Sequence, residues 1–439
     1  MTKIAIIGAG GYEFPLQLMN DFLSFASTQD AHYALMDIDP RSLARTERLA
    51  RRLVEAHNLP AKIDPTTDRA TALNGADFVV VCFQVGGRDA YAVDMEVPRR
   101  YGLDQTVGDT LGPGGVFRGL RSMKALDEIT SDMLRYCPDA LLLNYANPMA
   151  VNCWFAAGQG IRTTGLCHSV QHTADELASI MGLEDGTWSF RAAGINHQAW
   201  MLDFRHHGRD VMAELRTAVN EYHRGERTPV RELDEWYAGG RESVRTAILN
   251  LTGWFQTESS HHASEYYPHF RRDPRQVERL LPERWDYLDI TRGNNEAQLD
   301  QMATEFAEGT LAVSEEYAAR IIDSVLTNSP RVIYGNVPNT GLITNLPDGC
   351  CVEVPCLVDQ NGVQPTFVGD LPAAGAGIDL ASVGYQQCVV EAYRQRSKDL
   401  VYTAVSLDRL TSSMLDLDQI RAMTDEMFAA QQQWLPELS

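Results

Sequence analysis

The sequence predicts an α/β protein with a doubly wound N-terminal domain, built on a parallel sheet, and a mixed α/β C-terminal domain. Two observations support this fold class. Apolar segments of strand length alternate with helical segments over the first part of the chain, and a glycine-rich turn follows the first strand-like segment. Since 439 residues exceed the size of a typical single core, we expect two closely packed domains, residues 1–196 and 197–439.

The N-terminal domain is predicted from short apolar runs that are separated by helices. Five runs have the length and composition of buried strands: Lys3–Gly8, Tyr33–Met36, Phe78–Phe83, Ala140–Asn147 and Thr163–Cys167. Helices are expected at Leu16–Leu23 and at Pro40–His57, where the apolar residues fall on one helical face. This alternation is typical of a parallel sheet that helices cover on both sides.

The pattern changes beyond about Asn196. Two long stretches, Glu214–Tyr222 and Glu296–Thr327, have polar-helical character, and a short strand-rich segment follows at Val332–Val358. Helical segments return toward the end of the chain. These features indicate a C-terminal domain that mixes helices with a sheet.

The composition excludes several classes of protein. Hydrophobic residues make up 44% of the chain and charged residues 22%, which is ordinary for a globular enzyme. The chain has 38 Lys and Arg against 59 Asp and Glu, a formal net charge of -21, so no nucleic-acid partner is expected. The longest apolar runs have strand length, so we expect no membrane partner either.

Three features favour a cytoplasmic location. A strand-like segment begins at Lys3, with no charged and then apolar leader before it. No segment has the length and apolarity of a membrane span. Eight cysteines, several of them inside apolar runs (Cys82, Cys137, Cys388), are typical of buried thiols in a reducing compartment.

The turn Gly8-Ala9-Gly10-Gly11 separates the first strand from the first helix, and Asp37 follows the second strand. Gly8, Gly10 and Gly11 permit a tight turn and let backbone N–H groups approach a pyrophosphate. Asp37 can accept hydrogen bonds from ribose hydroxyls and would repel a 2′-phosphate, which favours NAD over NADP. Glu13 replaces the third glycine of the usual fingerprint, and an ordinary glycine-rich turn is the alternative interpretation. The combination of strand, turn, helix and acid favours a Rossmann-like NAD-binding domain.

Eight segments spread over the chain form a further set of motifs: Leu35–Asp39, Asp109–Gly115, Asn144–Met149, Gly165–Gln171, Ala193–His197, Thr257–Tyr266, Val332–Val337 and Gly349–Val358. In this order they resemble glycoside hydrolase family 4, from about residue 3 to the C-terminus. Three motifs make the α-galactosidases (melibiases) of that family most similar in appearance: ALMDID at 34–39, DTLGPGG at 109–115 and LCHSVQ at 166–171.

The resemblance implies a Rossmann-like N-terminal domain and a mixed C-terminal domain, with NAD and a divalent metal, usually Mn²⁺, as cofactors. It implies a reaction in which the C3 hydroxyl of a glycoside is oxidised to a ketone and a base then removes the C2 proton. The C1 leaving group departs, water adds back, and the ketone is reduced again. This reaction is an exception to hydrolysis by two carboxylates. The resemblance also implies a homodimer or homotetramer with a small-molecule glycoside substrate.

Cys167 and His197 stand where the family has its metal ligands. Their separation of 30 positions carries no spacing signal, so the residues alone favour a buried thiol and a core histidine. The resemblance implies instead that both bind the metal. A divalent ion there could polarise the ketone at C3 and stabilise the enolate that forms on loss of the C2 proton.

Four other residues are candidates for the active site. Tyr266 stands in the place of the base at C2, with Tyr267 as the alternative, and a nearby cation would have to lower its pKa. His168 stands in the place of the acid that protonates the leaving oxygen, or else it orients a neighbour. Asn147, at a strand end, is expected to bind sugar hydroxyls. Asp109 is expected in the active site, as a substrate or water contact or as a plain turn carboxylate.

Two departures from the melibiase pattern flank these residues: His172 stands in place of a glycine, and His261 opens a pair that usually begins with an acid. Both histidines could bind an anionic sugar, so an α-glucuronidase or α-galacturonidase is the first alternative function. An α-glucosidase of the same family is a further alternative. A NAD-dependent sugar dehydrogenase is a second alternative and a catalytically dead binding module a third. We therefore expect an NAD- and metal-dependent α-galactosidase.

Overall fold

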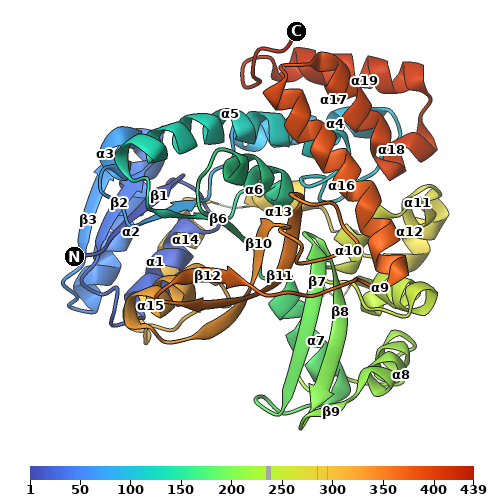
Figure 1. Ribbon diagram of the computed structural model, residues 1–439, viewed down its shortest axis with the longest axis horizontal. Coiled ribbons are helices and arrows are strands. Elements are labelled where there is room, and N and C mark those ends of the chain that lie inside the picture. Colours follow the sequence, from blue (N-terminus) through green and yellow to red (C-terminus); the bar gives the residue numbers. More distant parts are fainter. Residues whose placement is uncertain (234–238, 284, 294) are drawn as a thin grey trace.

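The computed structural model describes residues 1–233, 239–283, 285–293 and 295–439. The strands in these residues are β1 Lys3–Ile7, β2 His32–Met36, β3 Lys62–Thr66, β4 Phe78–Val81, β5 Leu141–Asn144, β6 Thr163–Leu166, β7 Trp188–Ile195, β8 Gln198–His206, β9 Arg209–Asp210, β10 Arg331–Pro338, β11 Cys351–Asp359 and β12 Gly362–Pro365. They form a single sheet in the order β3-β2-β1-β4-β5-β6-β10-β11-β7-β8-β9, and β12 pairs with β11 (Figure 1).

The described helices lie around this sheet. Those in the first half are α1 Pro15–Leu23, α2 Pro40–Ala56, α3 Arg69–Leu73, α4 Gly87–Arg100, α5 Gly112–Tyr136, α6 Met149–Gly158, α7 Ser169–Met181 and α8 Met212–His223. Those in the second half are α9 Gly239–Thr252, α10 Ser260–Ala263, the 3₁₀ turn Ser264–Tyr266, α11 Pro268–Arg271, α12 Pro274–Leu280, α13 Tyr287–Gly293, α14 Glu296–Glu308, α15 Ala318–Thr327, α16 Ala373–Arg394, α17 Lys398–Leu407, α18 Arg409–Met414 and α19 Leu417–Gln431.

The first six strands are parallel, in the order β3-β2-β1-β4-β5-β6. This order belongs to the doubly wound Rossmann-like fold, so the predicted fold class is confirmed. Residues of β4 and β5 are buried on both faces of the sheet, because helices pack on each side. On one side α5 packs against α3 and α6, and on the other α2 packs against α1 and α14.

The antiparallel strands extend the same sheet rather than form a separate one. β10 runs antiparallel to β6, and β11 connects β10 to the β7–β8 hairpin. Gly165, Asn336, Glu353 and Gly194 pair in succession across these four strands. The residues just after β6 and the turn after β7 are thereby brought into one region of the sheet.

One helical stretch expected from the sequence is divided. Glu296–Thr327 forms two helices, α14 and α15, with an irregular segment at residues 309–317 between them. The side chain of Asn295 caps the first helix, whose last turn ends at Gly309. The backbone is extended at Gly309, so the helix stops there, and the following segment contacts the N-terminal part of α7 through Glu315 and Glu316.

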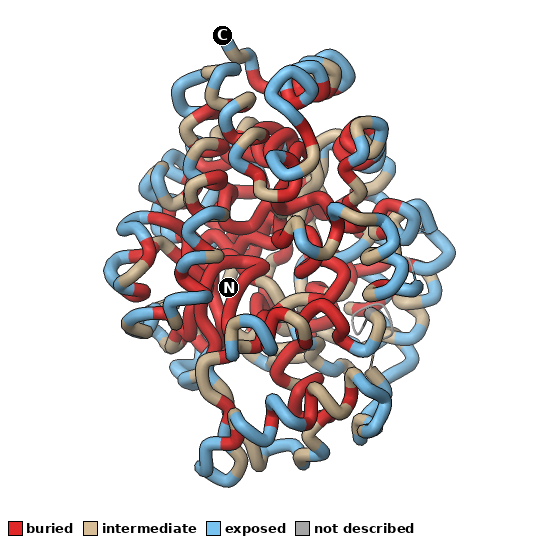
Figure 2. The backbone as a smooth tube through the Cα atoms, turned by 90° about the vertical axis from the view of Figure 1, so that its right-hand side faces the viewer, coloured by how far each residue is buried: buried red, intermediate tan, exposed pale blue. Residues whose placement is uncertain are grey.

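Buried residues are concentrated in the middle of the molecule, and exposed ones lie around its periphery (Figure 2). The C-terminal helix α19 is attached to this core by a polar contact. The buried Arg121 guanidinium donates to both carboxylate oxygens of Asp94, at 2.9 and 2.7 Å, and Gln431 of α19 donates to Asp94 at 2.8 Å. Among the described residues, no helix has the length and apolarity needed to span a membrane.

Replacing Asp94 by Ala should lower the free energy of unfolding by about 3–5 kcal/mol, because it leaves the fully buried Arg121 charge without its carboxylate. Denaturant unfolding followed by circular dichroism measures this loss. Asp300→Ala is the matched control: its pair with Arg48 is exposed on both sides, so the change should stay below about 1 kcal/mol. Equal losses in the two variants would contradict the role assigned to the buried pair.

Candidate active site

The glycine-rich turn lies against Asp37. Gly8 has a φ of 93°, and a Cβ atom there would lie 2.7 Å from the backbone nitrogen of Phe83. The N–H of Gly10 donates to Oδ2 of Asp37 at 2.8 Å, and a side chain at position 10 would collide with the same carboxylate. The close approach of the turn to its neighbours therefore requires glycine at positions 8 and 10.

Glu13, which replaces the third glycine of the fingerprint, has a partner in the C-terminal half of the chain. The hydroxyl of Tyr287, on α13, donates to Oε1 of Glu13. Its negative charge thus interacts with a phenol, and the turn is held against the segment that contains α13.

Cys167, His197 and Glu258 form a cluster in which one potential ligand atom from each residue lies within 4.8 Å of the others. Cys167 follows β6, His197 lies in the turn between β7 and β8, and Glu258 precedes α10. The backbone of Glu258 has a φ of 77°, which residues other than glycine rarely adopt. Thiolate, imidazole and carboxylate together are a donor set that suits a divalent transition metal.

The electrostatics of this cluster also suit a cation. Burial raises the pKa of the Cys167 thiol to about 12, so an ion would have to displace its proton. Burial also disfavours the charge of Glu258, but the neighbouring His197, His262 and His168 outweigh it and lower the pKa of Glu258. The cluster therefore contains one carboxylate that is charged at neutral pH and one thiol that an ion can deprotonate.

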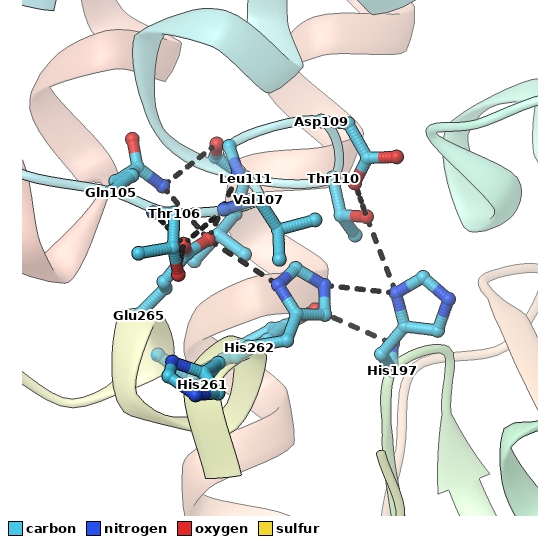
Figure 3. Close-up of polar contacts among 12 residues, drawn as sticks. Gln105, Thr106, Val107, Asp109, Thr110, Leu111, His197, His261, His262 and Glu265 are labelled. Carbon is cyan, nitrogen blue, oxygen red and sulfur yellow. Dashed lines mark hydrogen bonds and ion pairs between the residues drawn. The ribbon is translucent and has the colours of Figure 1, made fainter. Parts of the chain in front are cut away.

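His197 is held by its Nδ1 atom. This nitrogen lies 3.2 Å from Oγ1 of Thr110 and 3.0 Å from Nε2 of His262 (Figure 3). His197 is only 6% exposed, and its ring is packed edge-on against that of His262. Because Nδ1 is engaged, Nε2 is the nitrogen that can face an ion.

Asp109 and Asn147 lie together next to His197. The Nδ2 group of Asn147 donates to Oδ2 of Asp109 at 2.8 Å, and Thr110 donates to Oδ1 at 2.7 Å. Burial disfavours the Asp109 charge, but Arg118 and the two histidines outweigh it and lower its pKa. The Oδ1 atom of Asn147 is buried without a hydrogen-bond partner in the described part of the chain. A buried acceptor without a partner is costly, and it suits a hydroxyl group of a ligand.

The structure distinguishes the two candidate tyrosines. The hydroxyl of Tyr266 lies 3.4 Å from the backbone nitrogen of His197, beside the cluster. The hydroxyl of Tyr267 donates to Gln256 at 2.6 Å instead and is engaged there. Burial, together with the nearby Glu258 carboxylate, raises the pKa of Tyr266 well above 10. Tyr266 is therefore the better-placed phenol, and it needs added positive charge to act as a base.

His168 is the N-cap residue of α7, directly after Cys167, and its side chain is 42% exposed. Its Nδ1 atom lies 3.0 Å from Oε1 of Glu316, in the segment between α14 and α15. Partial burial lowers the pKa of His168, but the hydrogen bond to Glu316 and the charges of Cys167, Glu316 and Glu258 together outweigh this effect and raise the pKa to about 10. The imidazole is therefore held by Nδ1 and carries a proton at neutral pH.

The two histidines that depart from the melibiase pattern have other surroundings. Nδ1 of His172 lies 3.5 Å from a carboxylate oxygen of Glu315, so it already interacts with an acid. His261 is buried, its ring centre lies 6.0 Å from that of Trp285, and it points away from His197 (Figure 3). This arrangement does not favour either histidine as the receptor of an anionic sugar.

A buried carboxylate, Glu265, holds the active-site segments together. Three consecutive backbone N–H groups, Thr106–Gly108, donate to it at 2.6, 2.7 and 3.1 Å, and Nδ1 of His262 lies 3.3 Å away. Burial disfavours its charge, but these partners and Arg271 outweigh it, so the pKa of Glu265 lies well below its usual range. The loop that contains Asp109 is thereby fixed to the 3₁₀ turn that ends at Tyr266.

Three carboxylates of the candidate site escaped the sequence analysis, Glu258, Glu265 and Glu316, and His262 entered it only as the second residue of the pair that departs from the melibiase pattern. Glu258, His262 and Glu265 lie inside the Thr257–Tyr266 motif, where the acids and the second histidine were a signal that could have found them. Glu316 lies 148 positions from His168, in an irregular segment, and no pattern in the sequence points to that contact.

Both parts of the chain match the same family of known proteins. The family model described as "Family 4 glycosyl hydrolase" matches residues 3–183, and that of its C-terminal domain matches residues 192–411. An α-galactosidase of Bacillus subtilis is 36% identical over 445 residues, which cover 100% of both chains. An α-galactosidase of Rhizobium meliloti is 37% identical, over 99% of this chain and 89% of that protein.

A crystal structure of a 6-phospho-α-glucosidase from gut microorganisms, in complex with NAD and Mn²⁺, has a similar fold. It superposes with a TM-score of 0.84 and 20% identity, and the match covers 100% of each chain.

If the cluster binds a divalent ion, Mn²⁺ titrated into the chelator-treated protein should bind with about one ion per chain. Cys167→Ser and Glu258→Gln should each weaken binding at least tenfold, because each removes or neutralises one donor. Electron paramagnetic resonance of the free ion measures the affinity. Wild-type affinity in both variants would contradict this metal site.

Proposed function

The chain belongs to glycoside hydrolase family 4, and we propose that it is an α-galactosidase that works with NAD and a divalent metal, in the first place Mn²⁺. The observation that carries the proposal is the Cys167–His197–Glu258 cluster, with the phenol of Tyr266 beside it. The similarity of the chain to two α-galactosidases, at 36% and 37% identity over nearly its whole length, supports galactose as the sugar.

The residues present fit both cofactors. Gly8, Gly10 and Gly11 would receive the pyrophosphate of NAD, and Asp37 would bind the adenosine ribose and oppose a 2′-phosphate. Cys167, His197 and Glu258 would hold the metal. When bound, NAD would supply oxidation and reduction at the C3–H bond of the sugar, and the metal would polarise the C2 and C3 oxygens.

Binding and orientation of the sugar are assigned to Asn147 and Asp109. The unpartnered Oδ1 of Asn147 is an acceptor for a sugar hydroxyl, and its Nδ2 group is held by Asp109. Thr110 connects Asp109 to His197 through hydrogen bonds of 2.7 and 3.2 Å. The sugar-binding groups and the proposed metal ligand thus belong to one hydrogen-bonded network.

Two residues are assigned proton transfers. Oη of Tyr266 takes the proton from C2, and positive charge in the adjacent cluster would lower its pKa toward the working range. His168 gives a proton to the leaving oxygen at C1 through Nε2, because Glu316 holds the ring by Nδ1. Tyr266 Oη thus accepts the proton from C2, and His168 Nε2 donates the proton to the leaving oxygen.

The remaining expectations belong to the same proposal. We place the enzyme in the cytoplasm as a homodimer or homotetramer that acts on a small-molecule glycoside, with domains at residues 1–196 and 197–439. Among the alternatives, the pairing of His172 with Glu315 and the orientation of His261 favour a neutral galactoside over a uronide. A sugar dehydrogenase would accumulate NADH in step with product, whereas the proposed hydrolase would not.

Hydrolysis of nitrophenyl α-galactoside in heavy water, with NAD, Mn²⁺ and a thiol reductant, tests the mechanism. The product should carry deuterium at C2, because the proton taken by Tyr266 exchanges before water adds back. Tyr266→Phe keeps the ring and deletes the oxygen, so turnover should fall by about 10²–10⁴-fold. Tyr267→Phe is the matched control and should keep near-normal activity, since its hydroxyl binds Gln256. An unlabelled C2 together with full activity of Tyr266→Phe would overturn the proposal.

His168→Asn should affect substrates unequally. An alkyl or sugar leaving group needs a proton at its oxygen, so hydrolysis of melibiose should fall by about 10²–10⁴-fold. Nitrophenolate leaves without a proton, so the nitrophenyl α-galactoside should lose far less activity. Comparing kcat/KM for the two substrates measures the difference. An equal loss on both would point to an orienting role for His168.

A further inference from the structure

Glu265, His262 and His197 form a chain of contacts that leads from a buried carboxylate to the proposed metal ligand (Figure 3). The steps are 3.3 Å from Glu265 Oε2 to His262 Nδ1 and 3.0 Å from His262 Nε2 to His197 Nδ1. Glu265 and His262 are at most 1% exposed. Bulk water therefore does not compete for these hydrogen bonds.

The directions of these hydrogen bonds follow from the acceptor at one end. A carboxylate only accepts, so His262 donates to Glu265 through Nδ1–H. In the neutral ring, Nε2 of His262 is then an acceptor, and His197 donates to it through its own Nδ1–H. The free lone pair of His197 consequently lies on Nε2.

Thr110 supports the same assignment from another element. Its hydroxyl proton goes to Oδ1 of Asp109, at 2.7 Å, because that carboxylate can only accept. The hydroxyl oxygen, 3.2 Å from Nδ1 of His197, is then left as an acceptor. Both neighbours of His197 Nδ1 thus accept from it, which selects one tautomer.

We propose that Glu265 and His262 are positioning residues that fix the tautomer and the ring orientation of His197, so that Nε2 is presented to a divalent cation shared with Cys167 and Glu258. The inference rests on the proposed role of His197 as a metal ligand. Carboxylates and other acceptors behind a ligating histidine commonly act in this way, and their loss typically weakens metal binding by 10- to 100-fold.

Glu265 is suited to this role because it is itself immobilised. Its other contacts include the three backbone N–H groups of Thr106–Gly108, in the loop that also contains Asp109 and Thr110. The same carboxylate therefore orients His262 and places the loop whose threonine contacts His197. The two acceptors of the His197 proton are held by one anchor.

Mn²⁺ alone, titrated into the chelator-treated full-length protein and followed by electron paramagnetic resonance, tests the proposal. His262→Leu should weaken Mn²⁺ binding by about 10- to 100-fold, because no acceptor remains at that position. His262→Gln should recover most of the affinity, since its side-chain oxygen can accept from His197. His261→Asn, next in the chain but with its ring turned away, should bind Mn²⁺ within twofold of the wild type. Adding Glu265→Gln to His262→Leu should weaken binding further, but by less than Glu265→Gln weakens it alone, because only the effect on the loop of Thr110 is left.

NAD affinity in the same samples reports on folding and should not change, because the glycine-rich turn between β1 and α1 would hold the pyrophosphate and belongs to other elements than His262. Wild-type Mn²⁺ affinity in His262→Leu, or equal loss in the Leu and Gln variants with NAD binding intact, would overturn the positioning role. If the wild type itself binds no Mn²⁺, or if Cys167→Ser binds it normally, the metal site of the proposed function fails as well. These outcomes separate the two proposals.

Discussion

The Glu265 carboxylate is buried with its charge intact, and the arrangement of the active site depends on how that charge is stabilised. An isolated ion without access to water would be unstable, so the carboxylate needs fixed donors. Backbone N–H groups of residues 106–108, which lie 157 to 159 positions away in the sequence, and the ring of His262, three positions away, supply them. These donors come from two distant segments. The hydrogen bonds that stabilise the charge of Glu265 therefore also hold the loop of Asp109 against the turn of Tyr266.

The sheet provides the rigid part of the site, and irregular segments provide the rest. Asn147 and Cys167 follow β5 and β6, where ligands of doubly wound sheets bind. His197 comes from the turn of the antiparallel hairpin that β10 and β11 connect to β6. Glu258, His262 and Glu316 lie in short helices and loops that could not keep their positions alone. Hydrogen bonds to buried carboxylates and to strand ends hold them in place, as is common for catalytic residues on loops.

The N-terminal half was predictable from sequence because its signals are local. Apolar runs such as Phe78–Phe83, the glycine turn and Asp37 each report on their own few residues and neighbours. The extension of the sheet through β10 and β11 was not predictable, since those strand pairings join residues far apart in the chain. The same reason explains the site: Cys167 and His197 became candidates only through a resemblance, and the contact between His168 and Glu316 had no signal at all.

The same acidic residues around the cluster raise the pKa of the proposed base, Tyr266, and of the proposed metal ligand Cys167. Glu258 and Asp109 add to burial in raising the pKa of Tyr266, and Glu353 and Glu258 do so for Cys167. Glu353 is itself buried with one oxygen lacking a partner among the described residues, and burial raises its pKa to about 7. Such an anionic, poorly hydrated region favours protons on its phenol and thiol, and a divalent cation would reverse both preferences at once. Cation binding, loss of the Cys167 proton and a lower pKa of Tyr266 would thus be coupled by the same set of charges. Without the ion, the proposed metal site would keep the proposed base protonated.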